Sequence, residues 1–310
     1  MQINSVTRRS GLLAAVLLFA IVVANVAVAA AHAASEGIVL WLHAVATALL
    51  MFATGMLVGR MSIKGGIFRT FCTLPIPMFG IVACGAGTDV ATTNIYSAAF
   101  CLVVALLLFS ESLHAPEAKN PVFFGAILLG GMALLYPPCI VLVLLLPMAV
   151  VIASYSVRQI AIACIGWLLP IFAVSYVSWY AGGDFCGVAL SWVERLTEPQ
   201  PFAEFERLPV VPIVIFAIVG LLVVAGIVLR SMDRDSMLVN VRKALQMLGT
   251  TLAILLCACA LPCCTIAIVP IIAVPAAVLA SFTLENGRTD ISTIVYWLLL
   301  LLSVLHLFVR

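Results

Sequence analysis

Residues 120–184 read NPVFFGAILLGGMALLYPPCIVLVLLLPMAVVIASYSVRQIAIACIGWLLPIFAVSYVSWYAGGD. Only Arg158 and Asp184 carry charge in this stretch, and its apolar runs are too long for single strands. A helix needs about 17–25 mostly apolar residues to cross roughly 30 Å of hydrocarbon. The stretch therefore predicts three consecutive membrane crossings, the first two separated only by the Tyr-Pro-Pro turn at residues 136–138. The predicted crossings cover residues 121–136, 139–157 and 159–180.

The rest of the chain has the same composition. Of its 310 residues, 65% are hydrophobic and 9% are charged, and the net charge is +2. Soluble domains are about 45–50% apolar and about 25% charged. Even in ordinary proteins, apolar atoms contribute over half of the folded surface. A chain with a much larger apolar share therefore has more apolar surface than one globular core can bury. We therefore expect the lipid bilayer as solvent, which excludes a soluble enzyme, a disulfide-rich secreted domain and a nucleic-acid binder.

Apolar runs that could form spans recur along the whole sequence. Backbone groups in lipid must be satisfied within their own segment, and the runs lack the alternation of outer-membrane strands, so helices are expected. We predict an all-α, polytopic transmembrane helical bundle of about 10–11 spans, a single integral membrane domain over residues 1–310. The further runs are 11–33, 38–58, 70–85, 94–110, 209–229, 244–261, 264–283 and 291–309.

The basic residues predict the orientation of the bundle. Lys and Arg are enriched in cytoplasmic loops of membrane proteins. With the N-terminus cytosolic, the eleven runs leave only three of the 15 basic residues outside, namely Arg195, Arg207 and Arg310. This asymmetry predicts a multi-pass protein with a cytosolic N-terminus and an outer C-terminus. The first run, preceded by Arg8 and Arg9, also imitates a secretory signal, and its length favours an uncleaved signal-anchor.

Two loops have distinct character. Residues 181–208 are expected on the outer side, where apolar residues at helical spacing indicate a short helix lying on the membrane interface. Residues 230–243 form a basic cytosolic loop, which attraction to anionic lipid headgroups explains. Neither is long enough for a separate catalytic domain.

The spans offer few groups for chemistry. No Asp, Glu, Lys or Arg lies in the middle of a predicted span, which weighs against an ion-coupled transporter. No nucleophile, nucleotide-binding or zinc motif is present, so we predict no catalytic residue, cofactor or metal. His43 is expected as an interhelical hydrogen-bond partner or, alternatively, a functional residue. The run CACALPCC at 257–264 is interpreted as small apolar packing, with a soft-metal or redox site as the alternative.

Prolines and glycines shape the predicted spans. Helices broken by proline build substrate sites in many carriers. Here prolines fall in the third run, in the run 264–283 and just before that run, although simple kinks are the ordinary explanation. Gly125 and Gly130 are expected to permit close helix packing. The prolines concerned are Pro75, Pro77, Pro262, Pro270 and Pro275.

The stretch quoted above also resembles a family of uncharacterised multi-pass inner-membrane proteins of the Bacteroidota. The resemblance is carried by the span that closes on Leu135-Tyr136-Pro137, by Arg158 after the following span, and by Gly166 and Pro170 in the next. The layout of residues 241–309 is similar as well. The resemblance implies a bacterial inner (cytoplasmic) membrane, a shared helical bundle and no particular reaction. Gly166 is expected to leave room for a neighbouring backbone. The candidate functional residues on the outer hairpin and its surroundings are Tyr136, Trp179, Tyr180 and Asp184, with Arg158 as an inner anchor.

Three functions are compatible with the sequence. The first is a non-enzymatic envelope component that acts by association with other envelope proteins. The second is a transporter or flippase for an uncharged or lipid-linked substrate. The third is a membrane-embedded enzyme resembling a glycosyltransferase. The lipid bilayer is the expected partner in all three cases, together with other envelope proteins or a lipid-linked molecule.

Overall fold

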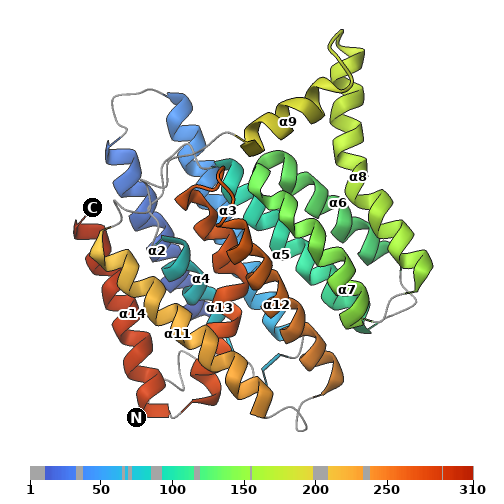
Figure 1. Ribbon diagram of the computed structural model, residues 1–310. Coiled ribbons are helices and arrows are strands. Elements are labelled where there is room, and N and C mark those ends of the chain that lie inside the picture. Colours follow the sequence, from blue (N-terminus) through green and yellow to red (C-terminus); the bar gives the residue numbers. More distant parts are fainter. Residues whose placement is uncertain are drawn as a thin grey trace.

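The structure is a computed structural model of the chain (Figure 1). It describes residues 11–32, 38–64, 67–68, 72–84, 93–114, 119–153, 156–197, 209–232, 238–287 and 289–309. Within these ranges the regular elements are all helical. In chain order they are α2 (Gly11–His32), α3 (Ile38–Lys64), α4 (Pro75–Cys84), α5 (Thr93–His114), α6 (Asn120–Leu135), the 3₁₀ helix η2 (Pro137–Leu144), α7 (Leu145–Ala153), α8 (Val157–Tyr180), α9 (Gly187–Thr197), α11 (Val210–Met232), α12 (Val239–Ala258), the 3₁₀ helix η3 (Ile266–Ile268), α13 (Val269–Asn286) and α14 (Thr289–Val309).

The helices are those of a multi-pass membrane protein. In the described part of the chain, six are long and apolar enough to cross a bilayer: Trp41–Ile63, Thr93–Leu113, Val157–Tyr180, Val210–Leu229, Val239–Ala258 and Ile266–Asn286. Shorter apolar helices cover Gly11–Ala27, Pro75–Cys84, Asn120–Leu135, Pro137–Ala153 and Asp290–His306. Each of the eleven predicted runs overlaps one of these helices, which confirms the all-α bundle. The cytosolic placement of the N-terminus stays a prediction.

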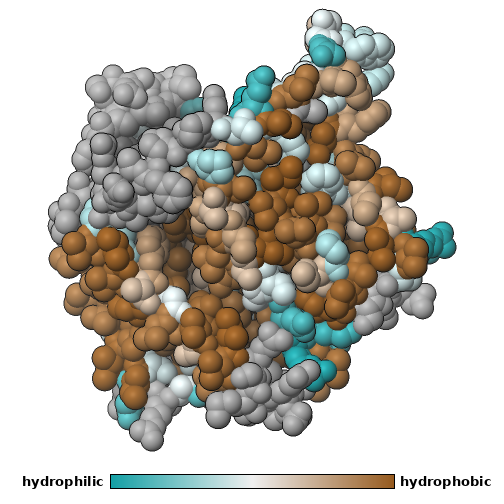
Figure 2. All heavy atoms as spheres, in the orientation of Figure 1, coloured by the Kyte–Doolittle hydropathy of each residue, from teal (hydrophilic) through white to brown (hydrophobic). Residues whose placement is uncertain are grey.

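The outer surface of the bundle is apolar. Figure 2 shows hydrophobic side chains over most of one face, with hydrophilic ones mainly toward its rims. Large apolar side chains such as Leu12, Leu42, Leu221 and Leu301 are more than half exposed. In water such a surface would drive aggregation. The surface therefore fits a lipid environment.

The third predicted span is shorter than expected. The run 70–85 forms only the 10-residue helix α4, which rises about 15 Å, half of the hydrocarbon thickness. The helix begins at Pro75 because proline fits the first helical turn but cannot extend a helix further back. Residues 72–74 before it are not helical. The prediction of a full helical crossing at this run is wrong.

The chain nevertheless returns across the bundle between α3 and α5. Thr93, the first residue of α5, has its Oγ1 3.0 Å from Oγ1 of Thr47 and 3.4 Å from Nδ1 of His43, both in the first half of α3. The beginnings of α3 and α5 therefore lie at the same end. Irregular backbone at membrane depth requires cover by protein. Every residue of α4 is buried, which satisfies that condition.

Helix α13 is the centre of the bundle. It packs against α4, α11, α12 and α5, and lies between them in Figure 1. Its residues from Val269 to Leu284 are buried, except the half-buried Ile272. The hydroxyl of Thr283 donates a 2.6 Å hydrogen bond to the carbonyl of Leu222, which ties α13 to α11. The proline-containing helices α4 and α13 are therefore direct neighbours in the core.

Helices α6 and α8 pack through glycines. A Cβ atom at Gly130 would clash with the carbonyl of Trp167, and one at Gly166 would lie 2.8 Å from the carbonyl of Phe123. A Cβ atom at Gly125 would lie 3.1 Å from the ring of Phe109. Without a side chain, each glycine lets a neighbour approach closely. This confirms the predicted packing role of these glycines.

Candidate functional site

The Tyr136 turn joins two distant parts of the chain. Tyr136 adopts an extended conformation between α6 and η2, and its side chain is buried. The backbone N–H of Thr265 donates to the Tyr136 hydroxyl at 3.2 Å, and the Thr265 Oγ1 lies 3.2 Å from the same oxygen. The Cys264 Sγ is 3.9 Å away. The turn between α6 and η2 is therefore fastened to the turn between α12 and α13.

Pro137 explains why a third segment, helix α9, also contacts the turn at Tyr136. In a continuing helix, the carbonyl of Ala133 would accept the N–H of residue 137, but proline has none. The indole N–H of Trp192 donates to this carbonyl instead, at 2.8 Å. Trp192 belongs to α9, so the loop helix is docked on the end of α6. The helix expected in residues 181–208 thus exists, and its position at the membrane interface stays a prediction.

These contacts bring residues 136, 192 and 265 to the same end of the bundle. The predicted alternation of spans puts all three on the outer side. Their position at one end of the bundle agrees with that alternation. The location outside the cell membrane therefore stays a prediction.

The other candidates from the hairpin region lie elsewhere. Helix α8 extends beyond the bundle in Figure 1 and ends where Gly182 adopts a left-handed φ of 89°. Trp179, Tyr180 and Asp184 lie at this end and are exposed. The Oδ1 of Asp184 accepts the N–H of Cys186 at 3.3 Å, which shapes the turn before α9. Among the described residues, no contact links these three side chains to Tyr136, so the four candidates do not form one site.

His43 and Arg158 are both exposed and lie on different helices. His43 is on α3, where its Nδ1 faces the hydroxyl of Thr93 on α5. This contact supports the interhelical role that the sequence favoured. Arg158 lies in the first turn of α8. The functional roles of both residues stay predictions.

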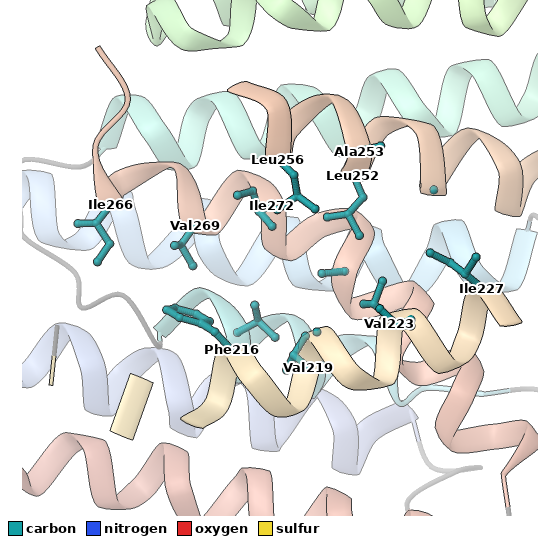
Figure 3. A pocket seen from close by; sticks show the side chains of 15 residues that line it. Phe216, Val219, Val223, Ile227, Leu252, Ala253, Leu256, Ile266, Val269 and Ile272 are labelled. Atoms are coloured by element: carbon teal, nitrogen blue, oxygen red, sulfur yellow. The ribbon is translucent and has the colours of Figure 1, made fainter. Parts of the chain in front are cut away.

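A groove that sequence reasoning missed lies between α11, α12 and α13. It encloses about 420 Å³, and Figure 3 shows side chains from the three helices converging on it. Its lining contains only aliphatic side chains, one phenylalanine and glycines. The lining residues are Val82, Phe216, Val219, Gly220, Val223, Val224, Ile227, Gly249, Leu252, Ala253, Leu256, Ile266, Val269, Ile272 and Ala276.

The shape of the groove follows from α11. Phe216, Gly220, Val223 and Ile227 recur at helical spacing and form a stripe along one face of this helix. At 1.5 Å per residue, the stripe is about 16 Å long, close to the hydrocarbon depth of one leaflet. Gly220 leaves a gap in the stripe, because a Cβ atom there would meet nothing within 4 Å. The stripe was visible in the sequence, but its pairing with α12 and α13 was not.

Thiols gather at the turn that precedes η3. All ten cysteines are free. At this turn the thiol of Cys259 donates a 3.4 Å hydrogen bond to the carbonyl of Leu255, and the thiol of Cys264 donates one of 3.7 Å to the carbonyl of Thr265. Within the described residues, no group of three or more His, Cys, Asp or Glu side chains is arranged to hold a metal ion.

No family model, curated protein or solved structure matches this chain. Function is therefore inferred from the groove, the short helix α4 and the contacts around Tyr136.

Proposed function

We propose that this chain is a non-enzymatic membrane protein that binds a hydrocarbon chain of a lipid or lipid-linked molecule in the groove. The apolar lining of the groove is the observation that carries this proposal. Lipid tails are as apolar as the lining, so the hydrophobic effect alone does not favour binding over the bulk bilayer. The gain comes from dispersion contacts between a confined chain and the close-packed walls.

The helices beside the groove support a role in moving such a molecule. Val82 at the groove comes from α4, and the groove continues along α13. Both helices contain prolines; α4 follows the non-helical residues 72–74, and α13 directly follows the 3₁₀ helix η3. Helices interrupted by proline are a feature of membrane carriers. The proposed substrate is consequently an uncharged or lipid-linked molecule whose chain enters the groove sideways from the bilayer.

The proposal includes a location. We propose a bacterial inner membrane on the basis of the resemblance, and a cytosolic N-terminus with Tyr136 on the outer side on the basis of the basic residues. Membership of the Bacteroidota family that the sequence resembles is part of the same proposal. A periplasm-active reporter fused after Gly183 and a cytosol-active reporter fused after Asp235 should both be active. An inactive reporter at either position, together with activity of the opposite reporter there, would contradict the orientation.

Photolabelling tests the groove. The purified protein is placed in vesicles with a phosphatidylethanolamine that carries a diazirine on one acyl chain, and labelled peptides are mapped by mass spectrometry. We expect label on α11, α12 and α13 at the groove. Gly220→Phe should reduce this labelling at least about tenfold, which corresponds to about 1.4 kcal/mol of binding. The new ring has room, because nothing lies within 4 Å of the first added carbon.

Gly131→Phe is the matched control. Gly131 lies on α6 away from the groove, and a Cβ atom there also meets nothing within 4 Å. The same substitution at this site should leave the labelling pattern unchanged. Even labelling of all lipid-facing helices, insensitive to Gly220→Phe, would show ordinary annular lipid and contradict the proposal.

A further inference from the structure

The face of α12 that lines the groove continues toward the start of this helix. Residues at alternating spacings of four and three fall on one face of a helix. Five residues of α12 follow this spacing, and each is exposed or half-buried, whereas Ala244, Thr251 and Leu255 on the opposite face are buried. The last three of the five line the groove. These residues, which we call the open face of α12, are Arg242, Gln246, Gly249, Ala253 and Leu256.

The open face changes from polar to apolar along its length. It begins with a guanidinium and an amide, and it ends with Leu256, which is 56% exposed. In Figure 3, Ile266 and Ile227 lie at opposite ends of the groove, and Leu256 lies nearer to Ile266 than Ala253 does. Helix α12 therefore runs toward Arg242 on the Ile227 side. At the other end, residues 257–268 contain no charged residue.

The open face has the length of one lipid leaflet. At about 1.5 Å per residue, α12 rises about 21 Å from Arg242 to Leu256. One leaflet of a bilayer, including its headgroups, is about 20–22 Å thick. A lipid lying along this face would therefore have its head at Arg242 and the end of its chain near Leu256.

The polar end of the open face has the chemistry of a phosphate ligand. The guanidinium of Arg242 presents a planar fork of N–H donors, which matches the geometry of phosphate oxygens. The amide of Gln246, one turn further along, can donate to an ester carbonyl. By the predicted orientation this end faces the cytosol, where basic pockets between membrane helices bind the headgroups of anionic lipids.

We propose that the groove binds a lipid whose head carries a phosphate group, with the phosphate at Arg242 and one hydrocarbon chain extending along the groove toward Ile266. This inference rests on the proposed function, because the chain occupies the same groove. It narrows the substrate to a molecule with a phosphate-bearing head. It also states the direction in which the molecule lies, with its head in the leaflet at the start of α12.

Two photoactivatable lipids test the role of the head. The purified full chain is placed in phosphatidylcholine vesicles that contain a trace of either phosphatidylglycerol or diacylglycerol, both with the same diazirine-bearing chain. Only the first of these two probes has a phosphate group. We expect phosphatidylglycerol to label the groove at least about tenfold more than diacylglycerol, because the charged head gains hydrogen bonds to the guanidinium.

Substitutions on α12 identify the residue responsible. Arg242→Gln should lower the labelling by phosphatidylglycerol to the level of diacylglycerol, and Arg242→Lys should retain part of it, because lysine keeps the charge without the planar fork. Lys243→Gln is the matched control. It removes one positive charge at the next position, which is turned about 100° around the helix. This variant should label like the wild-type protein.

The position of the diazirine on the chain tests the direction of binding. A diazirine near the ester of phosphatidylglycerol should label the groove around Gly249 and Ile227. A diazirine at the end of the same chain should label it around Val269 and Ile266. The labelled peptides are mapped by mass spectrometry.

Three results would overturn this proposal and leave the proposed function in place: equal labelling of the groove by both lipids, equal losses in Arg242→Gln and Lys243→Gln, or the reverse chain direction. Labelling by both lipids that is insensitive to Gly220→Phe would contradict the proposed function, and this proposal with it. Thermal melting shows whether each variant is folded. If Arg242→Gln does not fold, the comparison of the two lipids and the chain direction in the wild-type protein decide.

Discussion

Helices α13 and α8 have almost the same mean hydropathy, but they occupy opposite environments. In α13, 83% of the spanning window is buried inside the protein, whereas in α8 the share is 17%. Helix α8 packs mainly on α6, and residues such as Phe172, Tyr176 and Trp179 face outward. Hydropathy therefore identifies a membrane helix without telling whether protein or lipid surrounds it.

The physical reason is that lipid and protein interior are equally apolar. In water, burial of an apolar side chain is favourable, and the sequence pattern reveals the buried face. In lipid, neither face of an apolar helix is penalised, so packing and small residues decide the contacts. The contrast between α13 and α8 can be tested by substitutions that act on packing alone.

The largest effect is expected in the core of α13. Ile271 is fully buried, and Ile271→Ala should destabilise the protein by about 2–5 kcal/mol, because a cavity remains that its neighbours cannot fill. Leu168 on α8 is 54% exposed, and Leu168→Ala should change stability by less than about 0.5 kcal/mol. Unfolding in mixed detergent micelles measures both. Equal losses would mean that α8 is as closely packed in solution as α13.

A smaller loss is expected where α8 does touch the bundle. Gly130→Ala should cost about 1–3 kcal/mol, because the new methyl group meets the backbone carbonyl of Trp167, which cannot rotate away. Gly131→Ala adds the same group in open space and should stabilise α6 by about 0.5–1 kcal/mol through helix propensity. The melting temperatures of the two variants should therefore move in opposite directions. Matching shifts would show that α6 and α8 are not in close contact.

The smallest effect concerns two buried tyrosines. Tyr136→Phe removes the hydroxyl that Thr265 contacts and should cost about 1 kcal/mol, since the N–H of Thr265 loses its partner. The hydroxyl of Tyr296 on α14 has no hydrogen-bond partner among the described residues. Tyr296→Phe should therefore be neutral or slightly stabilising. The melting curves of the two variants test whether the hydrogen bond between Thr265 and Tyr136 stabilises the protein. An unchanged melting temperature in Tyr136→Phe would contradict this stabilising role.

Sequence reasoning worked best where it depended on composition. All eleven apolar runs are helices, and the Tyr-Pro-Pro turn at residues 136–138 separates two of them as expected. The packing roles of Gly130 and Gly166 were also predicted, because only a missing side chain permits such approach. The short helix α4 was missed, although Pro75 and Pro77 within the run were the available signal.

The candidate residues were harder to predict, because proximity depends on contacts between distant segments. Tyr136 was selected as a residue of the outer hairpin, and its side chain is buried against Thr265, more than a hundred positions further along the chain. A short helix was expected in residues 181–208, but the sequence did not indicate that the indole of its Trp192 satisfies the Ala133 carbonyl left open by Pro137. A single sequence contains no record of either pairing.

By itself, the sequence determined the solvent and the secondary structure of this protein, because an excess of apolar residues requires lipid and lipid requires backbone groups to be satisfied within helices. Only the tertiary structure decided which helices lie at the centre, where the groove opens and which turn Tyr136 contacts. Those choices depend on shape, since apolar helices in an apolar solvent are sorted by how closely their surfaces fit.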